Sequence, residues 1–161
     1  MTTIAIKDGV MACDSKESYS DGMITSWDAW KVALHEDCYY GFCGSSHWIT
    51  LAMDTIRNNG KLEALSPDID LVFLRMPKKG KPSVVYLADG HLSQEEITKN
   101  GYAIGSGMPY AMVAMSCGKS AVEAVKEAIK WDCFSGGKVR AYSFNNTKKT
   151  KKAEVVPYDE A

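Results

Sequence analysis

The chain opens with short apolar segments of the kind that form strands. A tight turn at Lys7-Asp8-Gly9 separates an alternating segment from an apolar one, which predicts a β-hairpin. A polar stretch follows this hairpin, and a second extended pair is expected after it. The strands predicted for this region cover residues 3–6, 10–13, 30–34 and 38–43.

Helical spacing first appears over residues 45–57, where apolar side chains recur on one face. Two more helices are predicted in the second half of the chain. One begins near Pro109, because proline is tolerated at the first helical position. The other begins at a capping box formed by Ser120 and Glu123. His91 is expected in a loop. The remaining strands are predicted over residues 69–75, 83–87, 139–144 and 153–156.

The order of these elements predicts an α+β fold. Strands occur in groups and do not alternate singly with helices, which disfavours a doubly wound parallel sheet. Two packed sheets with helices on the outside fit this order better. No low-complexity linker or change in composition divides the sequence, so a single domain is predicted over residues 1–161.

Composition and charge exclude several classes of protein. The 161 residues are 45% hydrophobic and 24% charged, which is ordinary for a folded protein. The net charge of −1 leaves no broad cationic face, so nucleic acid is not an expected partner. No apolar run approaches the roughly 20 residues that span a bilayer, and no signal-peptide pattern opens the chain. We therefore expect a cytoplasmic protein without a membrane partner.

Lysines gather between the last two predicted strands. A solvated hairpin tip explains them, and contact with an acidic partner is the alternative. The residues are Lys148, Lys149, Lys151 and Lys152.

The five cysteines are an odd number and contain no C-x-x-C pair, which is typical of free thiols in a reducing compartment. A zinc site is the alternative, because His35, Cys38, Cys43 and His47 lie close in sequence. In a continuous extended segment, however, His35 and Cys38 would point to opposite faces. Buried structural thiols are the favoured interpretation, and no metal or cofactor is expected.

Thr2 carries the first candidate chemistry. Methionine is commonly removed before a small second residue, and Thr2 would then bear a free α-amine beside its own hydroxyl. Such a residue combines nucleophile and base, because the amine can accept the hydroxyl proton. A nearby buried lysine would keep that amine neutral by like-charge repulsion, and Lys31, between Trp30 and Val32, is the candidate. An ordinary strand start would also explain Thr2.

Three glycine-containing segments add to this candidate, although a turn or a helix cap explains each one alone. They are Gly41-Phe42-Cys43-Gly44-Ser45, Gly105-Ser106-Gly107 and Asp132-Cys133-Phe134-Ser135-Gly136. Together with Thr2-Thr3-Ile4, Ala12-Cys13-Asp14, Lys31-Val32 and the run from Ala103 to Ala111, they resemble the proteasome β-subunit family, particularly its HslV peptidase branch. The matched segments occur in family order over almost the whole chain.

This resemblance implies an N-terminal nucleophile hydrolase with a four-layer αββα sandwich, in which two antiparallel sheets lie between helical layers. Thr2 would be the nucleophile and its amine the base. Lys31 would tune the proton affinity of that amine, and Asp14 would orient Lys31.

Five more residues receive roles from the same resemblance. The Gly44 amide would stabilise the oxyanion. Ser106, Asp132 and Ser135 would position the Thr2 amine, and Phe42 would give the primary specificity pocket a bulky floor.

The function that the resemblance implies is a threonine-type endopeptidase in a homo-oligomeric ring. It would cleave unfolded polypeptides supplied by an ATP-dependent unfoldase. Two alternatives stay open: a catalytically silent ring subunit that retains Met1, and an N-terminal nucleophile amidase that acts on a small molecule. The complete set of candidate residues favours an enzyme over the silent subunit, and the whole-chain resemblance favours the peptidase over the amidase.

Overall fold

The computed structural model describes residues 1–145 and 154–156. The four lysines predicted at a hairpin tip lie outside the described residues. The first sheet has five strands, in the spatial order β10 (Tyr102–Gly105), β1 (Thr3–Lys7), β2 (Val10–Cys13), β11 (Val139–Tyr142) and β12 (Glu154–Val156). The second has, in order, β5 (Val32–His35), β6 (Cys38–Cys43), β7 (Leu71–Pro77), β8 (Ser83–Ala88) and β9 (His91–Glu96). Neighbouring strands are antiparallel in both sheets.

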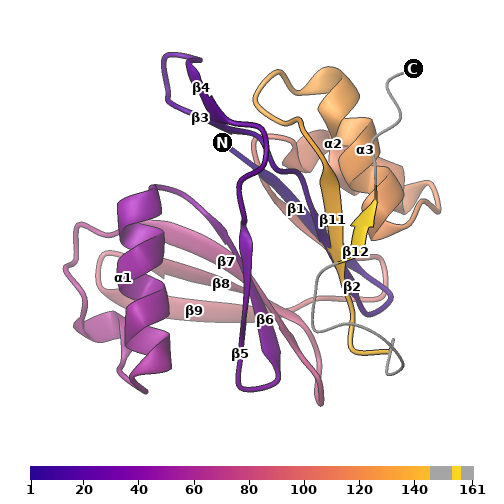
Figure 1. The fold of residues 1–161 in the computed structure, drawn as a ribbon. Coiled ribbons are helices and arrows are strands. Elements are labelled where there is room, and N and C mark those ends of the chain that lie inside the picture. Colours follow the sequence, from indigo (N-terminus) through magenta and orange to yellow (C-terminus); the bar gives the residue numbers. More distant parts are fainter. Residues whose placement is uncertain (146–153, 157–161) are drawn as a thin grey trace.

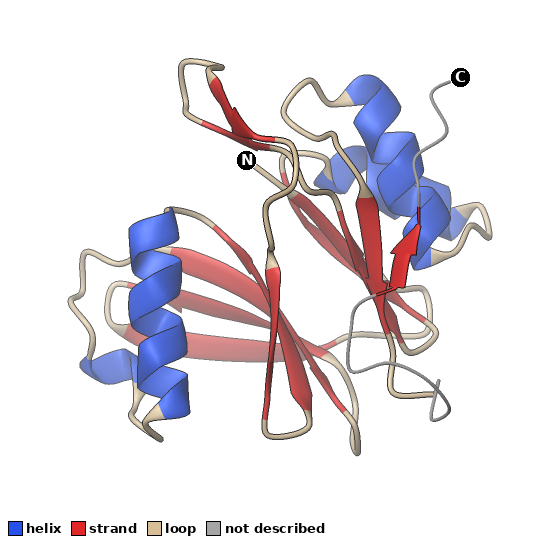
Figure 2. Cartoon of the chain, in the orientation of Figure 1, coloured by secondary structure: helices blue, strands red, loops and turns tan. Residues whose placement is uncertain are grey.

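Helices cover the outer faces of the two sheets (Figures 1 and 2). A separate two-stranded hairpin projects beyond the sheets near the N-terminus; it pairs β3 (Glu17–Ser18) with β4 (Ile24–Ser26). The helices are α1 (Ser46–Arg57), the 3₁₀ turn η1 (Leu62–Ala64), α2 (Met108–Ser116) and α3 (Ala121–Trp131). No helix among the described residues is both long enough and apolar enough to cross a membrane.

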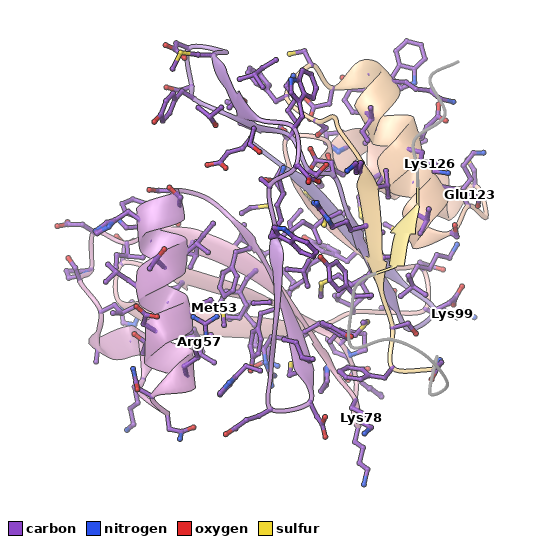
Figure 3. All side chains as sticks on the ribbon, in the orientation of Figure 1. Met53, Arg57, Lys78, Lys99, Glu123 and Lys126 are labelled. Carbon is purple, nitrogen blue, oxygen red and sulfur yellow. The ribbon has the colours of Figure 1, made fainter. Side chains whose placement is uncertain are left out.

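Three hydrophobic clusters lie between successive layers of the fold and pack them together. The first lies between the sheets and joins Ile4 and Met11 to Leu74 and Val84. The second packs α2 and α3 against the other face of the first sheet, and the third packs α1 against the outer face of the second sheet. Figure 3 shows side chains filling these layers, while Lys78 projects outward from the turn after β7. The order is therefore helices, sheet, sheet, helix, and the predicted α+β class is confirmed.

Side-chain alternation along β1 explains why this layer order forms. Ile4 and Ile6 belong to the cluster between the sheets, whereas Ala5 faces α2 and α3. Ala12 and Ala103 also lie on the helical side. Small side chains on that face allow the two helices to pack close to the sheet.

The predicted hairpins form around turns that need left-handed backbone. Asp8 and Gly9 have φ values of 51° and 74°, and they connect β1 to β2. Asp89 and Gly90 repeat the same pair, also at 51° and 74°. Asp-Gly is a preferred sequence for such turns because it tolerates positive φ.

The second of these turns corrects one expectation from the sequence. His91 is not in a loop but begins β9, where it pairs with Ala88 of β8. The side chains of β9 are exposed along its whole length, so the strand carries no apolar alternation. The Asp89-Gly90 pair was the available signal for this hairpin.

The chain start is held inside the first sheet, because β1 lies between the edge strand β10 and the central strand β2. Thr3 pairs with Gly105, and this contact leaves no room for a side chain at residue 105. A Cβ atom placed on Gly105 would lie 1.9 Å from the Thr2 carbonyl oxygen. The lack of a side chain at Gly105 therefore allows the Thr2 backbone to pack directly against residue 105.

We predict that Gly105→Ala is far more destabilising than Gly118→Ala. Both glycines have positive φ, at 95° and 88°, but an added Cβ meets nothing within 4 Å at Gly118. Gly118→Ala should lower the free energy of unfolding by about 1–2 kcal/mol, the cost of a left-handed alanine. Gly105→Ala should add the steric cost of displacing Thr2. Denaturant unfolding measures both, and equal losses would contradict the close approach.

Candidate active site

A pocket of about 700 Å³ lies beside the N-terminus. Its lining comes from Met1 and Thr2, from the β3–β4 hairpin, from the segment Ala29-Trp30-Lys31, from β5 and the end of β6, and from α1 as far as Met53. Of the residues expected to act in catalysis or binding, the pocket brings together Thr2, Lys31, Phe42 and Gly44. Thr2 directly precedes β1 of the first sheet, whereas the other three lie in or beside β5 and β6 of the second sheet, so the meeting of the two sheets places them in one cavity.

Lys31 and Asp14 form an ion pair at the base of this pocket. Lys31 Nζ lies 2.7 Å from Asp14 Oδ1, and the side chains are 7% and 0% exposed. The ammonium also donates to the Lys16 carbonyl at 2.6 Å and to the Met1 carbonyl at 3.0 Å. All three ammonium protons therefore have acceptors, as a buried lysine requires.

The Asp14 carboxylate is satisfied in the same way. Besides Lys31, Asp14 Oδ1 accepts from the Thr3 amide at 2.9 Å, and Oδ2 accepts from the Gly136 amide at 3.0 Å. The ion pair thus contacts the backbone on both sides of Thr2, since Lys31 binds the Met1 carbonyl and Asp14 binds the Thr3 amide.

A second polar network approaches the same segment from the other side. Asp132 Oδ2 accepts from Ser135 Oγ at 2.6 Å and from Ser106 Oγ at 2.7 Å. Ser106 Oγ lies 3.4 Å from the Thr2 carbonyl oxygen, and Ser135 Oγ lies 2.6 Å from Thr3 Oγ1. The three predicted residues therefore form one network, which reaches the Thr2 carbonyl and the Thr3 hydroxyl. That they position a free Thr2 amine stays a prediction.

Gly44 and Phe42 lie at the end of β6, where the chain turns into α1. Gly44 has a φ of 134° and an added Cβ would lie 3.0 Å from Leu71 Cδ1, so backbone and space both favour glycine. Phe42 is 3% exposed, and its ring packs 4.9 Å from that of Phe73, between centroids. The Phe42 side chain therefore combines a place in the core with a place in the pocket wall.

Sequence reasoning missed three groups that complete this site. Thr3 closes the Ser135 contact, Gly136 supplies an amide to Asp14, and Lys16 supplies a carbonyl to Lys31. Two of the three act through backbone atoms, which residue type does not reveal. For Thr3, the repeated threonine at the chain start was the only signal.

The zinc alternative fails on geometry within the described residues, where no group of three or more His, Cys, Asp or Glu side chains gathers around one point. The expected orientation of His35 and Cys38 on opposite faces is wrong, because this stretch is not continuously extended. His35 and Cys38 flank a turn and pair directly across β5 and β6, so they share a face. Cys43, however, belongs to the cluster between the sheets, while Cys38 belongs to the cluster under α1.

Comparisons with solved structures find the same fold in known proteins. Thiobacillus denitrificans BPH in complex with epoxomicin aligns with a TM-score of 0.67 at 22% identity, covering 88% of this chain and 96% of BPH. A second BPH structure aligns with a TM-score of 0.59, also at 22% identity, covering 88% and 95%. Eukaryotic HslV from Trypanosoma brucei aligns with a TM-score of 0.67 at 16% identity, covering 88% of this chain and 97% of HslV.

The chain has the HslV-type fold. No protein-family model matches the sequence, and no curated protein matches it. The similarity is therefore carried by the arrangement of elements rather than by sequence identity.

Two thiols are buried in the HslV-type core near the candidate site. Burial raises the pKa of both Cys13 and Cys43 to about 12. A thiol with a pKa far above neutral is almost entirely protonated, and the thiolate is the reactive form. Neither thiol is therefore a reactive nucleophile near neutral pH.

We predict that iodoacetamide at pH 8.5 modifies only Cys117 and Cys133 in the folded protein, because these thiols are exposed. Cys13, Cys38 and Cys43 are buried and should react only after unfolding. Raising the pH toward the pKa of about 12 should increase the thiolate fraction of Cys13 and Cys43. Mass spectrometry with peptide mapping counts the adducts, and rapid labelling of Cys43 at pH 8.5 would contradict this environment.

Proposed function

We propose that this protein is a threonine-type peptidase that acts through the Thr2 hydroxyl once Met1 has been removed. The observation that carries the proposal is the buried Lys31–Asp14 ion pair, 2.7 Å apart. The pair binds the backbone on both sides of Thr2, at the Met1 carbonyl and at the Thr3 amide. The HslV-type fold supports the same assignment. Removal of Met1 would convert the Thr2 nitrogen from an amide into an amine.

In the proposed reaction the neutral Thr2 amine accepts the proton of the Thr2 hydroxyl as the oxygen attacks a peptide carbonyl. The resulting tetrahedral intermediate collapses to an ester on Thr2, and the amine returns the proton to the departing peptide nitrogen. Water then adds to the ester with the amine again acting as base. The second peptide product leaves with a carboxylate, and the hydroxyl is restored.

Two groups in the pocket would favour these reaction steps. The Lys31 ammonium favours the neutral, basic form of the neighbouring amine through like-charge repulsion. The Gly44 amide would donate to the oxygen that becomes negative in the intermediate. Val32, Ile49 and Met53 add apolar surface beside Phe42, which suits an apolar substrate side chain.

The strongest rival is a silent subunit that retains Met1. Lys31 donates to the Met1 carbonyl, so the uncleaved terminus also has a place in the site. In that form the Thr2 nitrogen is an amide and is no base. The two functions differ in one bond, between Met1 and Thr2.

We further propose that the protein works as a homo-oligomeric ring with an ATP-dependent unfoldase, as the resemblance to HslV peptidases implies. Exposed apolar side chains on the projecting hairpin support a contact surface there. Tyr19 and Met23 are 60% and 56% exposed. Side chains of this size are usually covered by a partner when they gather in a patch.

We predict that Thr2→Ala abolishes hydrolysis and leaves the fold intact. The protein should be produced behind a cleavable leader, so that residue 2 becomes the N-terminus in every variant. Hydrolysis of an unfolded protein should fall by at least about 1,000-fold, since the nucleophile is lost. Thr2→Ser, the matched control, keeps both hydroxyl and amine and should retain activity.

Denaturant unfolding should show that Thr2→Ala is as stable as the wild type within about 1 kcal/mol, as expected for one lost hydroxyl. Wild-type activity in the Thr2→Ala protein would contradict the proposed mechanism.

A further inference from the structure

Arg140 of β11 carries a buried charge that the proposed reaction does not use. Its side chain is 2% exposed. In the register of the first sheet Arg140 pairs with Cys13, the residue before Asp14. Val139 belongs to the cluster under α2 and α3, while Cys13 and Tyr142 belong to the cluster between the sheets. Alternation along the strand therefore directs Arg140 toward the second sheet.

Among the described residues, the hydrogen bonds of the guanidinium and its aromatic contact fall on one short segment, Asp28-Ala29-Trp30. Arg140 Nη1 donates to the Ala29 carbonyl at 2.6 Å. Nη2 donates to the Asp28 carbonyl at 3.4 Å and also pairs with the Asp28 carboxylate. The guanidinium carbon lies 4.2 Å from the centroid of the Trp30 ring. One side chain therefore holds three consecutive residues, through a carboxylate, two carbonyls and an aromatic face.

Lys31 directly follows this segment. It has no regular secondary structure, so no ladder of hydrogen bonds fixes its backbone. Ser15 supplies two further anchors: its hydroxyl donates to the Trp27 carbonyl at 3.0 Å, and its carbonyl accepts from the Ala29 amide at 2.8 Å. At the Lys31 end, the Phe42 amide of β6 donates to the Lys31 carbonyl at 3.3 Å. Ser15 follows Asp14 directly, so the two ends of the ion pair are tied to each other through these anchors.

We propose that Arg140 is a positioning residue for the reaction: it fixes the backbone of Asp28, Ala29 and Trp30 and thereby the placement of the Lys31 ammonium. This inference rests on the proposed peptidase function. Arg140 itself neither contacts Thr2 nor lines the pocket; it holds Ala29 and Trp30, which do line the pocket, and it acts on the reaction through Lys31. Errors of about 1 Å in the placement of a catalytic group cost about 100-fold in rate.

The test compares steady-state hydrolysis by variants with Thr2 at the N-terminus. Active sites are counted by titration with a peptide epoxyketone, so that kcat refers to folded sites. Arg140→Met should lower kcat by about 10- to 100-fold with KM nearly unchanged. Arg140→Lys keeps the charge but lacks the planar fork, so it should restore part of kcat.

Lys138→Met is the matched control. Lys138 Nζ also approaches the Asp28 carboxylate, at 3.7 Å, but its side chain is 57% exposed. An exposed ion pair contributes little, so this variant should keep the wild-type kcat.

A variant with a milder change covers the case in which Arg140→Met does not fold. Asp28→Asn keeps a side-chain acceptor for Arg140 but removes the charge, and Asp28 is 58% exposed, so folding should survive. Its kcat should fall by less than that of Arg140→Met, again with KM nearly unchanged.

If Arg140→Met has the same kcat per titrated site as the wild type, the positioning role is overturned. If Arg140→Met does not fold, a wild-type kcat in Asp28→Asn overturns it. An inactive wild type with a free Thr2 would instead contradict the proposed function itself.

Discussion

A lysine and an aspartate that are both withdrawn from water remain charged only when every donor and acceptor has a partner. Lys31 and Asp14 meet this condition by binding four backbone groups in three stretches of chain, at Met1 and Thr3, at Lys16 and at Gly136. The chain start, the segment after β2 and the turn before β11 therefore converge on one pair of charges. This convergence holds the start of β1 in place between β10 and β2 and brings Thr2 to the pocket wall.

The polar network on the opposite side contacts the same segment through hydroxyl groups. Asp132 collects the hydroxyls of Ser106 and Ser135, and Ser135 in turn contacts the Thr3 hydroxyl. Thr3 is held by this network and by its pairing with Gly105. Because Thr2 is bonded to Thr3, these contacts also position Thr2, through the backbone and not through the Thr2 side chain. Rigid support of this kind is what a preorganised site requires.

Local rules were sufficient for those parts of the fold whose signals are local. The capping box at Ser120 begins α3 as predicted, and the Asp8-Gly9 turn joins β1 to β2. The β9 strand was missed because its exposed side chains carry no apolar alternation, and only pairing with β8 defines it. Arg140 was missed for a related reason: its partner Asp28 lies 112 residues away in sequence, and nothing near either residue indicates the contact.

The proposed peptidase requires that Thr2 presents a free amine and a hydroxyl in this pocket. The most direct measurement is the intact mass of the purified protein before and after treatment with a peptide epoxyketone. This reagent requires both groups, because the hydroxyl adds to the ketone and the amine opens the epoxide. The account predicts a mass lower by one methionine residue and the gain of one inhibitor per chain. A protein that retains Met1 and gains no inhibitor would contradict it and would favour the silent subunit.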